Sequence, residues 1–191
     1  VAGASRPDDV LVVGSSSPAR DLELVAVWHD APVVVSNRGL AGIDGTVSTV
    51  VGVALAAQVA GPVTVRALLG DLTFLHDVGG LLRGPDEPAV QAQLVVVNDD
   101  GGAIFATLEH GRPEHADIFE RVFATPHGAD LGALCAGYGV HHEAVSSVGA
   151  LREVLAAPRP GISVVEVVVD RQHRGPQGRA LADRVTAALG G

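Results

Sequence analysis

The chain has 191 residues, enough for one domain with a sizeable core. It contains no Met, so we expect a processed or truncated piece, or a chain whose beginning is not shown. A net charge of −9 argues against non-specific binding to nucleic acid or anionic membranes, and no apolar run reaches the ~18–20 residues of a membrane span. All thirteen basic residues are Arg, which excludes a Lys Schiff base and a Walker-type phosphate loop, and the single Cys excludes an internal disulfide and favours the cytoplasm.

Short apolar strands alternate with helical stretches along the chain. Residues 1–9 are polar and are expected to end an interdomain linker, which leaves 10–191 as one α/β domain. Strands are predicted at 10–13, 33–35, 63–69, 94–97, 141–145 and 162–168. Helices are predicted at about 19–27, from Gly45 to about 60, and at 118–123, 131–138, 147–156 and 180–189. This alternation predicts a doubly wound, mainly parallel sheet flanked by helices, with 109–129 as a loop that covers the site.

The turns after the first two strands are rich in small and polar residues. The first, Gly14-Ser15-Ser16-Ser17-Pro18, lacks the glycine spacing of a dinucleotide fingerprint and the nucleophile elbow of hydrolases. The second, residues 36–45, combines three glycines with Asn37, Arg38 and Asp44, an unusual composition for a simple connector.

Two further strands run into oxygen-rich turns. Gly70-Asp71-Leu72 follows one apolar run, and Asn98-Asp99-Asp100-Gly101-Gly102 follows the next. Ligands of open α/β sheets bind at such strand ends. Carboxylate and amide oxygens suit Mg²⁺ bound together with phosphates, and glycines allow the backbone to approach a diphosphate. The alternative is that these are two ordinary strand-to-helix turns.

This spacing resembles the diphosphate-binding signature of thiamine-diphosphate enzymes, Gly-Asp-Gly followed some twenty-five residues later by Asn-Asn. Leu72 and Asp99 depart from its commonest form without removing a ligand. The resemblance implies thiamine diphosphate with Mg²⁺ or Mn²⁺. It assigns the metal to the side chains of Asp71 and Asn98 and to the main-chain carbonyl of Asp100.

Longer runs narrow the resemblance to one family. Residues 36–45, 70–77 and 98–105 closely resemble the C-terminal domain of 2-succinyl-5-enolpyruvyl-6-hydroxy-3-cyclohexene-1-carboxylate synthases. The family reaction of menaquinone biosynthesis decarboxylates 2-oxoglutarate and adds the succinyl unit to isochorismate. The resemblance therefore implies these two partners, the remaining domains of the same protein and a second subunit, in a homodimer or homotetramer.

The resemblance also assigns roles to single positions. The cofactor-binding residues are Gly70, Asp71, Leu72, Ile43, Gly101, Gly102 and Ile104. The substrate-binding residues are Ser16, Arg20, Arg38, Phe105 and Leu108, where Arg supplies the cations that anionic substrates need. Arg20 could equally be a solvated helix residue, and Ile43 ordinary core. The catalytic Glu of the family lies on a separate N-terminal domain, so the isolated chain is expected to be inactive.

The remaining candidates for chemistry are weaker. His110 and His115 lack helical ligand spacing, and the adjacent His141 and His142 would point to opposite faces of a strand. Cys135 is predicted to be a small buried residue. Two other functions stay open: a non-catalytic module that binds Mg²⁺ with a nucleotide or phosphate, and another thiamine-diphosphate carboligase acting on 2-oxo acids.

Overall fold

The computed structural model describes residues 1–188 and 190 of the chain. It divides into two compact units. Unit 1 comprises residues 1–98 and 130–168, and unit 2 comprises residues 99–129 and the chain from Val169 onward. The sequence had predicted a single domain over residues 10–191. The assignment of residues 1–9 to a linker stays a prediction.

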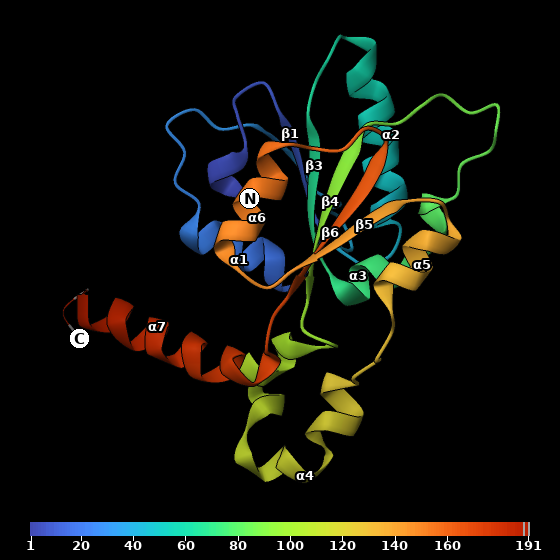
Figure 1. Cartoon of the computed structure of the whole chain (residues 1–191). Helices are drawn as coiled ribbons and strands as arrows, with labels where there is room; N and C mark the ends of the chain where they lie inside the picture. Colours follow the sequence, from blue (N-terminus) through green and yellow to red (C-terminus); the bar gives the residue numbers. More distant parts are fainter. Residues whose placement is uncertain (189, 191) are drawn as a thin grey trace. The chain divides into compact units, whose positions relative to one another are not determined.

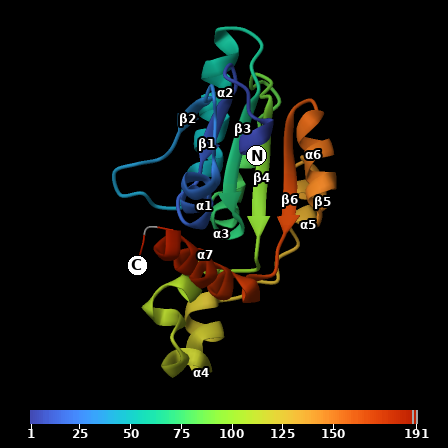
Figure 2. The same cartoon turned by 90° about the vertical axis from the view of Figure 1, so that its left-hand side faces the viewer.

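Unit 1 is built on a six-stranded, entirely parallel sheet with the strand order β2-β1-β3-β4-β6-β5. The strands are β1 (Val10–Val13), β2 (Val33–Val35), β3 (Val65–Gly70), β4 (Ala92–Asn98), β5 (His141–Val145) and β6 (Ile162–Val168). Figure 1 shows the sheet, and Figure 2 shows it from the side with β2 and β5 at opposite edges. The predicted doubly wound α/β fold is confirmed.

Helices cover both faces of this sheet. They are α1 (Ser17–Val25), α2 (Thr46–Val59), α3 (Asp71–His76), α5 (Leu131–Gly137) and α6 (Val148–Ala156), with 3₁₀ turns η1 (Ala2–Ala4) and η2 (Val78–Leu81). Side chains of α1 and α6 pack on one face, around a core that includes Leu11, Leu68 and Val95. Because strand side chains alternate, Leu94 and Val96 are buried on the other face, which α2, α3 and α5 cover.

The predicted helix starts differ from the structure where Pro and Gly occur. α1 begins at Ser17 because Pro18 fits the first turn of a helix, whose N–H groups have no intrahelical partner. The Ser147 cap of α6 is confirmed, since its hydroxyl oxygen accepts a hydrogen bond from the Ala150 N–H at 3.2 Å. Asp130 caps α5 in the same way through the Ala133 N–H at 2.8 Å.

Unit 2 consists of short helical segments and one long helix. These are η3 (Ala103–Thr107), η4 (Glu109–Gly111), η5 (Pro113–His115), α4 (Ala116–Phe119), the π-turn η6 (Glu120–Ala124), η7 (Arg171–His173) and α7 (Arg174–Ala188). The predicted loop at 109–129 is therefore more helical than expected. The helix predicted at 180–189 begins six residues earlier, at Arg174. Gly175 and Pro176 lie in its first turn, where a proline is tolerated. Leu189 lies outside the described residues.

Candidate functional site

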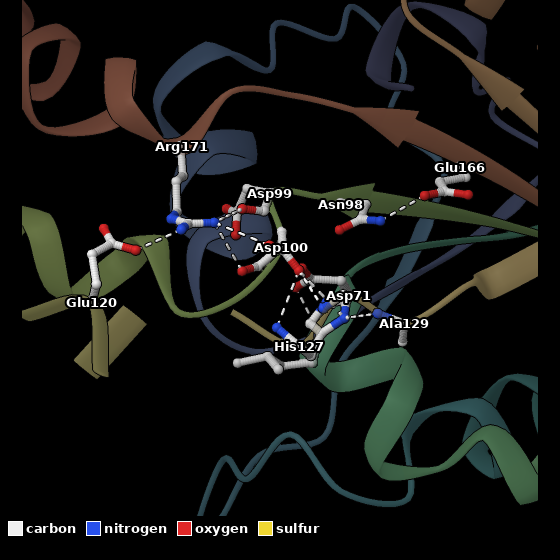
Figure 3. A network of polar contacts seen from close by, with 11 residues as sticks. Asp71, Asn98, Asp99, Asp100, Glu120, His127, Ala129, Glu166 and Arg171 are labelled. Carbon is white, nitrogen blue, oxygen red and sulfur yellow. Dashed lines mark hydrogen bonds and ion pairs between the residues drawn. The ribbon is translucent and has the colours of Figure 1, made fainter. Parts of the chain in front are cut away.

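The two oxygen-rich turns follow neighbouring strands, as predicted. β3 ends at Gly70 and β4 at Asn98, and Gly70 pairs with Val97 in the parallel ladder. Because the carboxyl ends of parallel strands lie at the same end of a sheet, the ladder brings Asp71 and Asn98 close to each other there. Both residues are labelled in Figure 3.

Asp71 is the first residue of α3 and is almost completely buried, with 3% of its surface exposed. Its carboxylate Oδ1 accepts a hydrogen bond from the Leu72 N–H at 2.7 Å. Burying a carboxylate costs free energy unless hydrogen bonds or a cation compensate. A buried carboxylate at a strand end can therefore bind a cation. Asp71 lies in unit 1.

Asn98 is held by Glu166, which His142 contacts in turn, and neither was among the site residues predicted from the sequence. Its Nδ2 donates to Glu166 Oε1 at 2.6 Å, and Glu166 Oε2 lies 2.7 Å from His142 Nε2. Figure 3 shows the Oδ1 branch of the Asn98 amide directed away from Glu166. The signal in the sequence was Glu166 itself, one charged residue inside the apolar strand β6.

The donor set in unit 1 fits a hard divalent cation. A carboxylate and an amide at one sheet edge offer oxygen ligands, which Mg²⁺ prefers and supplements with water and phosphate oxygens. Among the residues that the structure describes, no group of three His, Cys, Asp or Glu side chains could hold a metal ion. The predicted set is of a different kind, because it combines one carboxylate, one amide and one main-chain carbonyl.

Asp100, the predicted third ligand, lies in unit 2 with a left-handed backbone (φ 58°). Its carboxylate accepts hydrogen bonds from the N–H groups of Gly128 at 2.8 Å and His127 at 3.1 Å. The Gly128 bond above all holds the pKa of Asp100 below its usual range. The Asp100 carbonyl oxygen accepts from Arg171 Nη1 at 3.1 Å. A metal ion at this oxygen would therefore have to share it with a guanidinium or displace that group.

The two glycines after Asp100 have a local reason for being glycine. At Gly101 (φ 138°) a Cβ would lie 2.1 Å from the Ala124 carbonyl oxygen. At Gly102 it would lie 2.7 Å from that of Phe123, and the Gly102 N–H donates to the Ala124 carbonyl at 2.7 Å. Close approach of the backbone thus serves the folding of unit 2, whatever ligand these glycines also accommodate.

The apolar candidates of unit 2 lie on η3 and the residue after it. Ile104 and Phe105 are half-buried, whereas 39% of Leu108 is exposed. The Phe105 ring packs against those of His110 and Phe123, with centroids 6.0 and 6.1 Å apart. Their predicted role as an apolar wall of the substrate pocket stays a prediction.

The remaining candidates of unit 1 follow the carboxyl ends of β1 and β2. Ser16 precedes α1 with φ 82°, a backbone conformation that non-glycine residues rarely adopt. Arg20 is exposed on α1, and Ile43 is half-buried just before α2. Arg38 is exposed and lines a shallow cavity of about 300 Å³ together with Ser36 and Trp28. These residues follow the carboxyl ends of strands that run parallel to β3 and β4, so they lie at the same end of the sheet as Asp71 and Asn98.

Comparisons with known proteins agree with the sequence resemblance. No family model matches the chain. The chain is 50% identical over 98% of its length to the 2-succinyl-5-enolpyruvyl-6-hydroxy-3-cyclohexene-1-carboxylate synthase of Nocardioides sp., and 57% identical over 85% to that of Rhodococcus erythropolis. It covers 34% and 30% of these two relatives, so it spans about a third of their length.

Solved structures support the fold. A benzoylformate decarboxylase from Polynucleobacter necessarius matches 89% of the chain with a TM-score of 0.70 at 21% identity. A putative thiamin diphosphate-dependent enzyme from Mycobacterium smegmatis matches 88% with a TM-score of 0.66, also at 21% identity. The chain covers 32% and 30% of these two structures. From the identity along nearly its whole length, we conclude that the chain belongs to the family of the 2-succinyl-5-enolpyruvyl-6-hydroxy-3-cyclohexene-1-carboxylate synthases, of which it represents about one third.

Proposed function

We propose that this chain is the diphosphate- and Mg²⁺-binding part of a thiamine-diphosphate-dependent synthase. The whole enzyme would decarboxylate 2-oxoglutarate and add the succinyl unit to isochorismate in menaquinone biosynthesis. The observation that carries the proposal is the placement of Asp71 and Asn98 at the carboxyl ends of the neighbouring strands β3 and β4, in a chain of this family. Asp71 and Asn98 would bind the metal through their side chains, and the Asp100 carbonyl would be the third ligand.

The other candidate residues would handle the substrates. Bound thiamine diphosphate would supply the electron sink on which a 2-oxo acid loses CO₂. Arg20 and Arg38 would bind substrate carboxylates, for which a guanidinium fork is suited, and Ser16 would donate a hydrogen bond. The strained backbone of Ser16 supports this role, since such conformations cluster at functional sites.

Apolar residues would shape and dry the pocket. Ile43 would pack against the cofactor, and Ile104, Phe105 and Leu108 would form an apolar wall that excludes water. Gly70, Leu72, Gly101 and Gly102 would contact the diphosphate through the main chain. The carboxylate that activates the cofactor would come from another domain, on a second subunit of a homodimer or homotetramer.

The central test is a titration of thiamine diphosphate into the full-length protein with and without Mg²⁺. We expect metal-dependent binding that Asp71→Ala abolishes. Asp77→Ala is a matched control, because Asp77 ends the same short helix and its carboxylate accepts from the Ser48 N–H instead. Binding indifferent to both Mg²⁺ and Asp71 would overturn the proposal.

The same titration separates the two other functions. A preference for ADP over thiamine diphosphate would indicate the non-catalytic nucleotide-binding module. With cofactor binding established, turnover of 2-oxoglutarate with isochorismate distinguishes the proposed synthase from a carboligase that uses pyruvate. The isolated chain should bind the cofactor weakly and show no turnover, and appreciable decarboxylation by it would contradict the division of labour between domains.

The substrate-binding assignment has its own test. Arg38→Gln in the full-length enzyme should raise the KM of an anionic substrate about tenfold or more while leaving the affinity for thiamine diphosphate unchanged. Arg83→Gln is the control, since Arg83 pairs with Glu87 at 3.3 Å on the surface. Equal KM values in the two variants would remove Arg38 from the substrate site.

A further inference from the structure

A diagonal line of polar side chains crosses three strands of unit 1. In the ladder, Asn98 on β4 pairs with Val168 on β6, and Glu166 is two residues before Val168 on the same face. His142 on β5 pairs with Val164, again two residues before Glu166. The register therefore places Asn98, Glu166 and His142 on one face of the sheet, each diagonal to the next, within reach of long side chains.

These three side chains form a continuous hydrogen-bonded chain. Glu166 is 9% exposed and bridges the other two, with one carboxylate oxygen on Asn98 Nδ2 at 2.6 Å and the other on His142 Nε2 at 2.7 Å. The side chain of His142 is 18% exposed. A Cβ added at Gly132 would lie 3.2 Å from its Nδ1, so α5 passes close to the ring and restricts its orientation.

We propose that Glu166, held by His142, is a positioning residue that fixes the amide of Asn98 so that Oδ1 faces the metal. The proposal rests on the proposed function, because it concerns how this chain presents one ligand of the Mg²⁺ site. A metal ion can use only the oxygen branch of an amide, and the two branches are nearly identical in shape. An ionised carboxylate only accepts hydrogen bonds, so Glu166 selects the Nδ2 branch for itself.

The burial of Glu166 supports a role beyond filling space. An ionised side chain in an apolar strand is costly unless it is fully hydrogen-bonded, and an apolar residue would pack there at lower cost. Groups that orient metal ligands in this manner typically change metal affinity about 10–100-fold when removed.

The test uses the full-length protein at a fixed concentration of thiamine diphosphate and measures the Mg²⁺ concentration that half-saturates cofactor binding. Glu166→Met keeps the length of the side chain but removes the acceptor, and it should raise this concentration about tenfold. Glu166→Gln should stay within about twofold of the original protein, because its Oε1 can accept from Asn98 while its Nε2 donates to His142 in the tautomer that carries the ring proton on Nδ1. Glu143→Gln, on a half-buried position of β5, is the control for charge.

A double-substitution cycle distinguishes positioning from a general effect on the fold. If Glu166 acts through Asn98, adding Glu166→Met to Asn98→Ala should change the half-saturating Mg²⁺ concentration no further. Should Glu166→Met not fold, Glu166→Ala takes its place in the cycle. An equal loss with and without Asn98 would overturn the positioning role. So would a loss in Glu166→Gln as large as in Glu166→Met, since the charge alone would then explain it.

Failure of this inference is distinguishable from failure of the proposed function. If Asp71→Ala abolishes Mg²⁺-dependent binding while Glu166→Met leaves it unchanged, the metal site stands and the positioning role falls. If Asp71→Ala also has no effect, the proposed function itself is wrong, and the positioning role falls with it.

Discussion

Both faces of the sheet in unit 1 bury charged side chains. On one face a cation is paired with an anion, whereas the other face carries carboxylates near the ends of the strands. On the face that α1 and α6 cover, Arg66 on β3 donates to Gln93 at 2.8 Å, to the Ala4 carbonyl at 2.9 Å and to the Leu155 carbonyl at 2.9 Å. Asp9 balances its charge at 3.6 Å. On the other face, Glu166 and Asn98 lie near the carboxyl ends of their strands, and Asp71 follows the end of β3.

The comparison separates polar groups that hold the fold together from those that could bind a ligand. The Arg66 cluster joins η1, β3, β4 and the end of α6, and its positive and negative charges offset each other. The second face carries two buried carboxylates, Asp71 and Glu166, at an edge of the sheet where ligands of α/β proteins bind. We therefore expect substitutions on the first face to change stability, and those on the second to change cofactor binding.

The largest expected effect is on the first face. Arg66→Met would remove the cation from a cluster in which Asp9 and two carbonyl groups depend on it, and should lower the free energy of unfolding by about 3–5 kcal/mol. Denaturant unfolding measures this change. Arg83→Met, which breaks an exposed pair with Glu87, should cost less than about 1 kcal/mol. Equal costs would contradict the structural role of the cluster.

The next largest effect is expected on the second face, where a substitution should weaken cofactor binding and leave the stability of the fold nearly unchanged. Asp71→Asn keeps the size of the side chain and removes a buried negative charge, so the free energy of unfolding without ligand should change by less than about 1 kcal/mol. Binding of thiamine diphosphate with Mg²⁺ should weaken about a hundredfold, because the charged metal ligand is lost. A variant that loses stability but still binds thiamine diphosphate with Mg²⁺ would show that Asp71 stabilises the fold and does not bind the metal.

A third prediction uses Cys135 on α5 as a probe of how tightly the second face is packed. Burial, with a smaller contribution from the negative charge of Glu166, raises the pKa of the Cys135 thiol to about 11. At pH 8 its thiolate fraction, and hence its rate of alkylation, should be about a hundredfold below that of an exposed cysteine. Alkylation of the native and the denatured protein measures this ratio.

The same pKa fixes the sign of a pH effect on stability. The folded state retains the thiol proton more strongly than the unfolded chain does. The stability contributed by Cys135 is therefore present below the ordinary thiol pKa and is lost as the pH rises toward 11. In Cys135→Ala this alkaline loss should be smaller, as measured by unfolding at pH 8 and pH 10. An identical pH dependence in the two proteins would exclude the thiol as its source.

The smallest effects concern the caps of the helices on the two faces. Ser147→Ala on α6 and Asp130→Ala on α5 should each lower the free energy of unfolding by about 1 kcal/mol, because each leaves one N–H of the first turn without its side-chain acceptor. Of the two, only Asp130→Ala should also weaken Mg²⁺-dependent cofactor binding, since α5 lies against His142. Equal binding in both variants would show that α5 is not part of the support of Asn98.

Local pattern made most of unit 1 predictable. The bounds predicted for β1, β2, β5 and β6 agree with the structure, because each is a short run bounded by turn residues. The predicted start of α7 was wrong, because Gly and Pro have low helix propensity even in a first turn that tolerates them. The spacing of Asp71 and Asn98 placed them at adjacent strand ends correctly.

The support behind these ligands could not be predicted from the sequence. Glu166 is 68 residues from Asn98, and Arg66 is 89 residues from the carbonyl of Leu155 that it binds. Within each strand, Arg66 and Glu166 show only that a charge interrupts an apolar run. Which partner meets that charge depends on the order and register of strands distant in the chain, which one sequence does not specify.

The diagonal placement of Asn98, Glu166 and His142 has a consequence for how this segment tolerates change. Substitutions alter one side chain at a time, but deleting a single residue within β6 before Glu166 would shift the rest of the strand by one step. Glu166 would then point toward α6, and Val167 would face Asn98 instead. We therefore expect length variation to be confined to the loops around β6.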